Sequence, residues 1–72
     1  MEAYIKVKDN LFYKLENGKV TSINIDSKYT GQRRKDCKSI PTGYVEFLTI
    51  ISKEDYINAE TISLNLIMCT KA

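Results

Sequence analysis

The sequence predicts one small α+β domain, mostly β, with an antiparallel sheet and one short helix, and three observations support this prediction. The chain has 72 residues, which suits a single domain over residues 1–72. Its first third alternates polar and apolar residues with the period of a strand. The pair Asn17-Gly18 separates two alternating runs and is a strong hairpin signal. We therefore expect a small, curved antiparallel sheet.

The first part of the chain predicts a three-stranded antiparallel meander. Its strands are expected at residues 1–8, 11–16 and 19–26. The Asn-Gly turn sets a register in which Glu16 faces Lys19 and Phe12 faces Ile23, and both are favourable cross-strand pairs. Both faces of this hairpin carry apolar residues. The sequence leaves open which face is buried and predicts a helix, a loop or a partner over the other.

The second half of the chain predicts a strand, a short helix and a final strand. Residues 44–51 are the most apolar segment and predict a central strand. Ser52 precedes two acidic residues, a pattern typical of a helix N-cap, and predicts a helix near residues 53–59. Residues 61–71 alternate with a period of two and predict a strand. The expected order is β-β-β-loop-β-α-β, which also fits an SH3-like, partly open barrel.

Residues 27–43 interrupt these patterns and predict a long basic loop. The segment holds five basic residues and one acidic residue, whereas the rest of the chain holds six and eight. The net charge of +2 therefore describes a basic loop on a mildly acidic body. Compact domains seldom keep a loop of this length unless it is functional or disordered. The alternative is that residues 27–30 extend the third strand and residues 36–40 form a short edge strand.

This loop and its flanks supply the candidate partner-binding residues. Arginine suits anionic groups, and tyrosines near the ends of the loop could stack on exposed bases. The alternatives are a solvated loop, a contact with an acidic protein surface and a contact with nucleic acid. Nucleic-acid-binding domains typically have an isoelectric point above about 9, whereas this chain has one of 8.6. The candidate residues are Lys28, Tyr29, Arg33, Arg34, Lys35, Lys38 and Tyr44.

The composition argues against an enzyme. The chain has two cysteines and no histidine, which excludes an ordinary zinc site and every Ser-His or Cys-His nucleophile pair. Three scattered glycines make no phosphate-binding loop. A chain of this size also argues against a buried pocket of about 300 Å³ or more. We expect no catalytic residues, no metal and no cofactor.

The cysteines and the hydropathy bear on location. We expect Cys37 and Cys69 to be reduced and the protein to be cytoplasmic, because the first residues are charged and form no apolar leader. The basic neighbours of Cys37 favour a reactive thiol as an alternative. Cys69 is expected to be a core or edge residue of the last strand. No apolar run reaches the roughly 18 residues of a membrane span, so we expect no membrane contact.

These observations favour a small binding protein that acts through contact with another protein. The bias toward isoleucine, lysine and asparagine is typical of A+T-rich genomes, including low-GC bacteria, phages and other viruses. It suggests an accessory factor that modulates or inhibits a host protein, in the host cytoplasm if viral. The alternative is a nucleic-acid-binding protein that uses residues 28–38 and the flanking tyrosines. Open sheet edges also predict self-association, most simply as a two-fold dimer.

Overall fold

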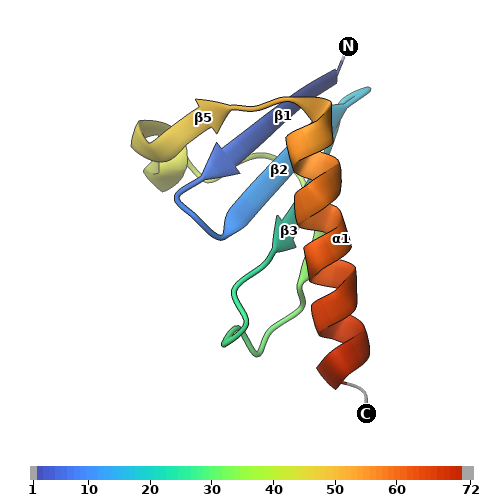
Figure 1. Ribbon diagram of the computed structural model, residues 1–72. Helices are drawn as coiled ribbons and strands as arrows, with labels where there is room; N and C mark the ends of the chain where they lie inside the picture. The colour runs from blue at the N-terminus through green and yellow to red at the C-terminus, as the bar shows by residue number, and fades with distance from the viewer. Residues whose placement is uncertain (1, 71–72) are drawn as a thin grey trace.

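The protein is a five-stranded antiparallel sheet with one α-helix packed on one face (Figure 1). The structure, a computed structural model, describes residues 2–70. Its elements are β1 (Glu2–Val7), β2 (Leu11–Glu16), β3 (Lys19–Asn24), β4 (Arg34–Cys37), the 3-10 helix η1 (Thr42–Phe47), β5 (Leu48–Ile50) and α1 (Lys53–Thr70). The strand order is β4-β3-β2-β1-β5, and the sheet does not close into a barrel. The predicted small α+β fold with an antiparallel sheet is confirmed.

Strands β1 to β3 form the predicted meander. Glu16 pairs with Lys19 and Phe12 pairs with Ile23, which confirms the register expected from the turn. Asn17 and its following glycine have φ values of 50° and 80°, the left-handed conformation that a tight two-residue hairpin loop requires at both positions. Local turn chemistry therefore sets the pairing of β2 with β3.

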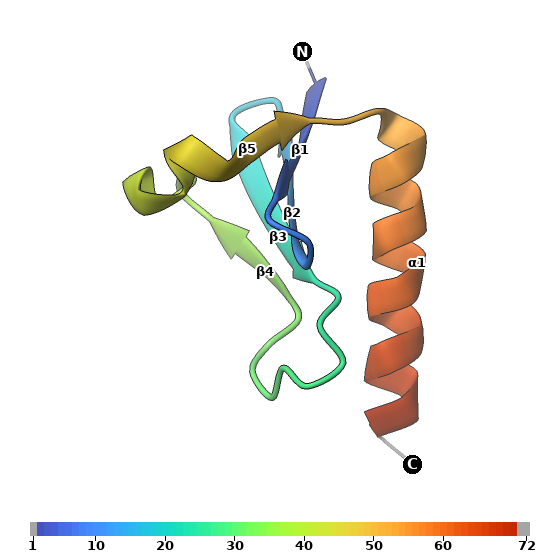
Figure 2. The same cartoon turned by 60° about the vertical axis from the view of Figure 1, so that its left-hand side comes forward.

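Both faces of the sheet are buried, by different parts of the chain (Figure 2). The core beneath α1, here called the helix-side core, consists of Tyr4, Phe12, Ile23, Tyr56 and Ala59. The core on the opposite face, here called the loop-side core, consists of Val7, Tyr13 and Val20, with Ile5, Leu11, Leu15, Cys37, Ile40 and Tyr44 packed against it. The chain itself thus covers both faces of the hairpin, with a helix over one and the β4–η1 segment over the other.

Helix α1 is longer than the sequence predicted. The N-cap is confirmed, because the Ser52 hydroxyl oxygen accepts a hydrogen bond from the backbone N–H of Asp55 at 3.1 Å. The helix then continues without a break to Thr70, so the expected helix over 53–59 is too short and the expected strand over 61–71 is wrong. Within residues 2–70, no helix combines the length and the hydropathy that crossing a membrane requires.

The strand prediction failed because the alternating apolar residues of this segment do not mark a buried face. Leu64 and Met68 are 46% and 71% exposed. The buried positions are Tyr56, Ala59 and Ser63, whose spacing of three and four residues is that of one helix face. The helix therefore contacts the sheet through a tyrosine and two small residues. The period of two among its large apolar residues wrongly indicated a strand.

The prediction of a central strand over 44–51 is also wrong. Residues up to Phe47 form η1, and the strand that follows, β5, has three residues and lies at the sheet edge. Val45 and Ile50 are 60% and 85% exposed. Tyr44 and Ile51, at the two ends of the segment, pack against the cores, but the apolar residues between them are exposed.

The long loop over 27–43 contains a strand. Strand β4 pairs with β3 in antiparallel fashion, so the alternative of a short edge strand is confirmed, two residues earlier than expected. The other part of that alternative is wrong, because β3 ends at Asn24 and does not reach residues 27–30. Of the predicted loop over 27–43, the residues after Cys37 lead into η1, and from here on the name basic loop refers only to residues 25–33, between β3 and β4.

Candidate functional site

The basic loop folds around the side chain of Arg33, which is 6% exposed. Its guanidinium donates hydrogen bonds to the backbone carbonyls of Asp26 at 2.6 Å and Tyr29 at 3.1 Å. Longer contacts reach the carbonyls of Asn24 at 3.4 Å and Ser27 at 3.5 Å. Both terminal nitrogens of Arg33 thus bind the loop's own backbone. Arg33, a predicted partner-binding residue, has a structural role in this arrangement.

Two short-range hydrogen bonds order the start of the same loop. The side-chain oxygen of Asn24 accepts a bond from the N–H of Asp26 at 2.8 Å. The carboxylate of Asp26 accepts a bond from the N–H of Lys28 at 2.9 Å. These are successive Asx turns, in which a side chain replaces a backbone acceptor. The loop is therefore held in one shape, and that shape positions Lys28 and Tyr29.

A groove of about 650 Å³ lies between the basic loop and the C-terminal half of α1. Figures 1 and 2 show why it forms: α1 continues past the ends of the strands and runs beside the loop. The groove is lined by residues 27–34 and, from the helix, by Ile67. Four of the seven predicted site residues line this groove: Lys28, Tyr29, Arg33 and Arg34.

The other three predicted residues lie elsewhere. Lys35 and Tyr44 line a separate hollow of about 220 Å³, and Tyr44 packs against the loop-side core. Lys38 lies beside the turn between β2 and β3, where it lines a groove of about 530 Å³. Tyr29 lines both the hollow of Tyr44 and the groove beside α1, so the two predicted tyrosines share the smaller hollow but not the larger groove.

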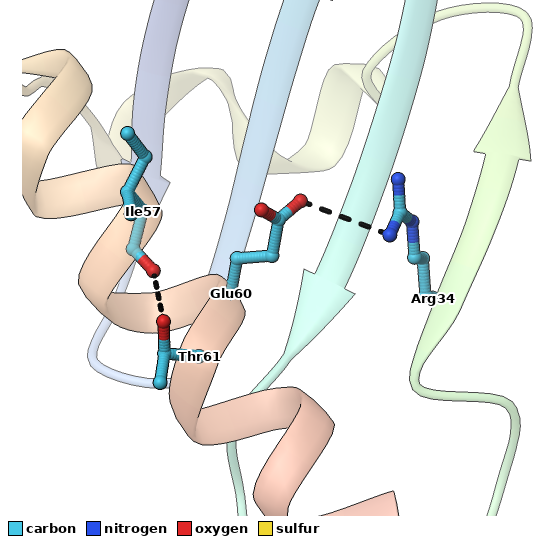
Figure 3. Close-up of polar contacts among 4 residues, drawn as sticks. All are labelled: Arg34, Ile57, Glu60 and Thr61. Atoms are coloured by element: carbon cyan, nitrogen blue, oxygen red, sulfur yellow. Dashed lines mark hydrogen bonds and ion pairs between the residues drawn. The ribbon is translucent and has the colours of Figure 1, made fainter.

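An ion pair connects α1 to the β4 edge across the sheet (Figure 3). The guanidinium of Arg34 lies 3.8 Å from the carboxylate of Glu60, and the Arg34 side chain is 50% exposed. Such an exposed pair contributes little stability, about 0–1 kcal/mol. On the side of the helix away from Arg34, the Ile57 carbonyl accepts a hydrogen bond from the Thr61 hydroxyl at 3.0 Å. The ion pair identifies the flank of the helix that faces the β4 edge.

The helix beyond Glu60 is uncharged as far as Thr70. Ile67 lies three residues after Leu64, and Met68 lies four residues after Leu64, so Leu64 neighbours both side chains on the helix surface. Leu64 is about half exposed and Met68 is largely exposed, so the apolar surface of the helix continues outward from Ile67. Sequence reasoning missed these two residues because it placed them on a strand. The uncharged run after a capped helix start was the available signal.

The shifted ionisable groups are tyrosines of the cores and one glutamate, none of which lines the groove beside the basic loop. A hydrogen bond of 2.5 Å from the Tyr4 hydroxyl to Glu2 raises the pKa of Tyr4 to about 12 and lowers the pKa of Glu2. Burial, together with the nearby Glu60 carboxylate, raises the pKa of Tyr56 to about 12. The hydrogen bond to Glu2 and the burial favour the neutral form of these tyrosines. The shifts indicate no acid–base pair.

Cys37 lies on the sheet face away from α1. Its thiol is free, half-buried and 3.7 Å from the hydroxyl oxygen of Ser22. Because side chains alternate along a strand, Cys37 lies on the opposite face from Arg34. The side chain of Cys69 falls outside the described residues. In the described part of the chain, no group of three or more cysteine or acidic side chains could hold a metal ion.

The expectation of no buried pocket of about 300 Å³ stays a prediction, because the larger hollows of the described surface are open grooves. Besides the groove beside α1, the surface carries hollows of about 530 and 310 Å³. Both exceed the roughly 300 Å³ at which ordinary ligand sites begin. The case for a binding protein therefore depends on which side chains line the grooves.

Comparisons with family models, with curated proteins and with solved structures give no match to this chain. The assignment of a function therefore depends on the geometry and charge of the chain itself.

Proposed function

We propose that this protein binds an acidic, amphipathic segment of another protein in the groove between the basic loop and α1. One observation carries the proposal: Lys28 and Arg34 share this groove with Ile67, and Leu64, one helical turn before Ile67, is exposed. Lys28 and Arg34 line the loop side of this groove. Leu64 and Met68 continue the apolar surface on the helix side. A segment with acidic residues on one face and apolar residues on the other would match both sides.

The charge of the groove favours carboxylates. The guanidinium of Arg34 already attracts the carboxylate of Glu60 at 3.8 Å, while half of its side chain stays exposed. Arginine can bind a second carboxylate because its planar fork presents several donors. Glu60 is the last acidic residue of the chain, so the helix side of the groove offers no further repulsion to an acidic ligand.

The order of the basic loop supports tight recognition. The Arg33 bonds and the Asx turns hold the loop before any ligand arrives. A preordered loop loses little conformational entropy on binding, which leaves more of the contact energy for affinity. Methionine adds adaptability, because its unbranched side chain fits irregular apolar surfaces.

The arrangement favours protein over nucleic acid as the ligand. Stacking on single strands needs exposed aromatic rings along one basic groove. Tyr29 and Tyr44 line one hollow, but its volume is only about 220 Å³ and Tyr44 packs against the loop-side core. Lys38 lies at the β2–β3 turn and does not extend the charged surface of Lys28. In the wider role that we propose, a host protein in the cytoplasm is modulated or inhibited because its acidic segment is occupied.

A binding assay with defined probes tests the proposal. The probes are a labelled acidic peptide with leucines at helical spacing, a scrambled peptide of the same composition and a single-stranded oligonucleotide. We expect fluorescence anisotropy to report binding of the first peptide only, weakening with added salt. Lys28→Glu and Met68→Asp should each weaken binding about tenfold, or about 1.4 kcal/mol.

The matched control is Lys53→Glu, which makes the same charge change at the exposed start of α1, where an acidic residue suits the helix dipole. It should leave peptide affinity within about twofold of the parent protein. Binding of the oligonucleotide in place of the peptide would support nucleic acid and overturn the proposal. Equal losses for Lys28→Glu and Lys53→Glu would show attraction by net charge alone, and would overturn it too.

A further inference from the structure

The two edges of the sheet differ in charge. Strand β4 presents three charged residues, Arg34, Lys35 and Asp36, and all three are exposed. Strand β5, with the sequence Leu48-Thr49-Ile50, presents none, and all three residues are exposed. Natural proteins place charges on edge strands to prevent another strand from adding to the sheet. The β4 edge has this protection and the β5 edge lacks it.

Exposed apolar side chains concentrate at the same unprotected edge. Among the described residues, eight large apolar side chains are exposed, and four of them lie within residues 45–50. They are Val45, Phe47, Leu48 and Ile50. The Lys8 ammonium lies 4.7 Å from the ring centroid of Phe47 and covers part of that ring. Ile50, at 85%, is the most exposed of the group.

The direction of the backbone groups along β5 follows from one hydrogen bond. The N–H of Ile51 donates to the carbonyl of Tyr4 at 2.9 Å, so Ile51 faces β1. In an antiparallel ladder, residues that exchange hydrogen bonds alternate with residues that do not. Thr49, opposite Lys6, therefore also faces β1. The N–H and C=O groups of Leu48 and Ile50 point outward, away from the sheet.

We propose that β5 pairs with β5 of a second copy of this chain, antiparallel about a two-fold axis at Thr49. In this register Leu48 of each copy lies opposite Ile50 of the other. Both residues have outward backbone groups, so the two pairs together make four N–H···O=C bonds. The two sheets then form one continuous sheet of ten strands, since each copy has five. The edge is thus complementary to itself, as a two-fold interface requires.

The side chains support the same register. Leu48 pairs with Val7 and Ile50 pairs with Ile5, so Leu48 and Ile50 lie on the face of the loop-side core. Across the proposed axis, each leucine would contact the isoleucine of the other copy as a cross-strand apolar pair. The loop-side core would thus continue from one copy into the next, and Ile50 would lose its exposure.

The small size of the edge sets the expected affinity. A standard specific interface covers about 800 Å² on each partner, which is about 15% of the 5276 Å² accessible surface of this protein. A strand of three residues with its flanking 3-10 helix lies at the low end of that range. We therefore expect a reversible dimer with a Kd of about 10–100 µM. This inference does not depend on the groove, which lies beside the opposite edge of the sheet.

Sedimentation velocity over about 10 µM to 1 mM tests the proposal. The parent protein should shift from the monomer mass of 8.3 kDa toward twice that mass as concentration rises. Ile50→Lys should stay monomeric throughout, because it places a charge on the self-pairing edge. The matched control is Ile57→Lys, at a 46% exposed apolar position on α1, which should dimerise like the parent.

A parent protein that stays at 8.3 kDa at the highest concentration would overturn the proposal. A dimer that survives Ile50→Lys but is lost in Ile57→Lys would also overturn it, because the interface would then lie on the helix. Circular dichroism of both variants should match the parent, since neither side chain belongs to a core cluster.

Discussion

Strands β4 and β5 close the two ends of the same sheet and present opposite surfaces. The outer edge of β4 is charged, lies beside the ordered basic loop and carries Arg34, which connects it to α1. The outer edge of β5 is apolar and uncharged. Each edge exposes unpaired backbone groups, so charge decides which of them another strand can join. The comparison supports our two proposals, an acidic partner beside the β4 edge and a second copy at the β5 edge.

The largest expected effect on stability comes from removing the Arg33 guanidinium, which binds the backbone of the basic loop beside β4. Arg33→Met leaves buried carbonyls without their donors, and we expect a loss of about 2–3 kcal/mol in the free energy of unfolding. Urea denaturation measures it. The exposed neighbour provides the control: Lys35→Met should cost less than about 0.5 kcal/mol. Equal losses would show that the burial of Arg33 does not matter to the fold.

The second prediction removes the charges of the β4 edge. The triple variant Arg34→Thr, Lys35→Thr and Asp36→Thr makes β4 as uncharged as β5. A chain whose two sheet edges can both pair with other copies can add copies without limit, because the assembly no longer closes at the dimer. Light scattering should then report masses above twice 8.3 kDa. A variant that stops at the dimer would show that charge is not what protects the β4 edge.

The third prediction concerns Tyr4 and Tyr56, the two tyrosines of the helix-side core beneath α1. Its expected effect on stability is smaller. The pKa values of Tyr4 and Tyr56 are raised from 10.0 to about 12. A raised pKa means that the folded state holds these protons more tightly than the unfolded state. Stability is therefore fully present below pH 10 and falls as pH rises toward 12. Thermal unfolding across this range should show a declining Tm.

Tyr56→Phe separates the two tyrosines. The Tyr56 hydroxyl is buried without a hydrogen-bond partner, so its removal should stabilise the protein at neutral pH by up to about 1 kcal/mol. The variant should also lose stability less steeply between pH 10 and 12 than the parent. An unchanged slope would assign the alkaline loss to other groups.

The sequence predicted the parts of this fold that local chemistry determines. The Asn17-Gly18 turn and the Ser52 cap were both found, because each depends on residues within a few positions. The length of α1 was missed because two of the three residues of its buried face, Ala59 and Ser63, are small. Such small residues do not show the hydrophobic period of a helix in the sequence. The exposed Leu64 and Met68 instead contributed to a period of two, which is that of a strand.

The candidate site was predicted in part for the same physical reason. The basic residues of the 27–43 segment are visible in the sequence, so Lys28 in the basic loop and Arg34 in β4 were identified. Ile67, the helix residue that shares their groove, comes from more than 30 residues further along the chain and joins the loop only in the folded protein. The burial of Arg33 was not predicted either, since its partners are backbone carbonyls, which no sequence pattern marks.

Amide hydrogen exchange at low and high protein concentration tests the difference between the edges most directly. We predict that the amides of Leu48 and Ile50 gain protection as concentration rises, because they bond to a second copy. The amides of Thr49 and Ile51, which face β1, should be protected at both concentrations. The outward amides of β4, at Arg34 and Asp36, should exchange equally fast at both. Concentration-dependent protection at β4, or none at Leu48 and Ile50, would contradict the account.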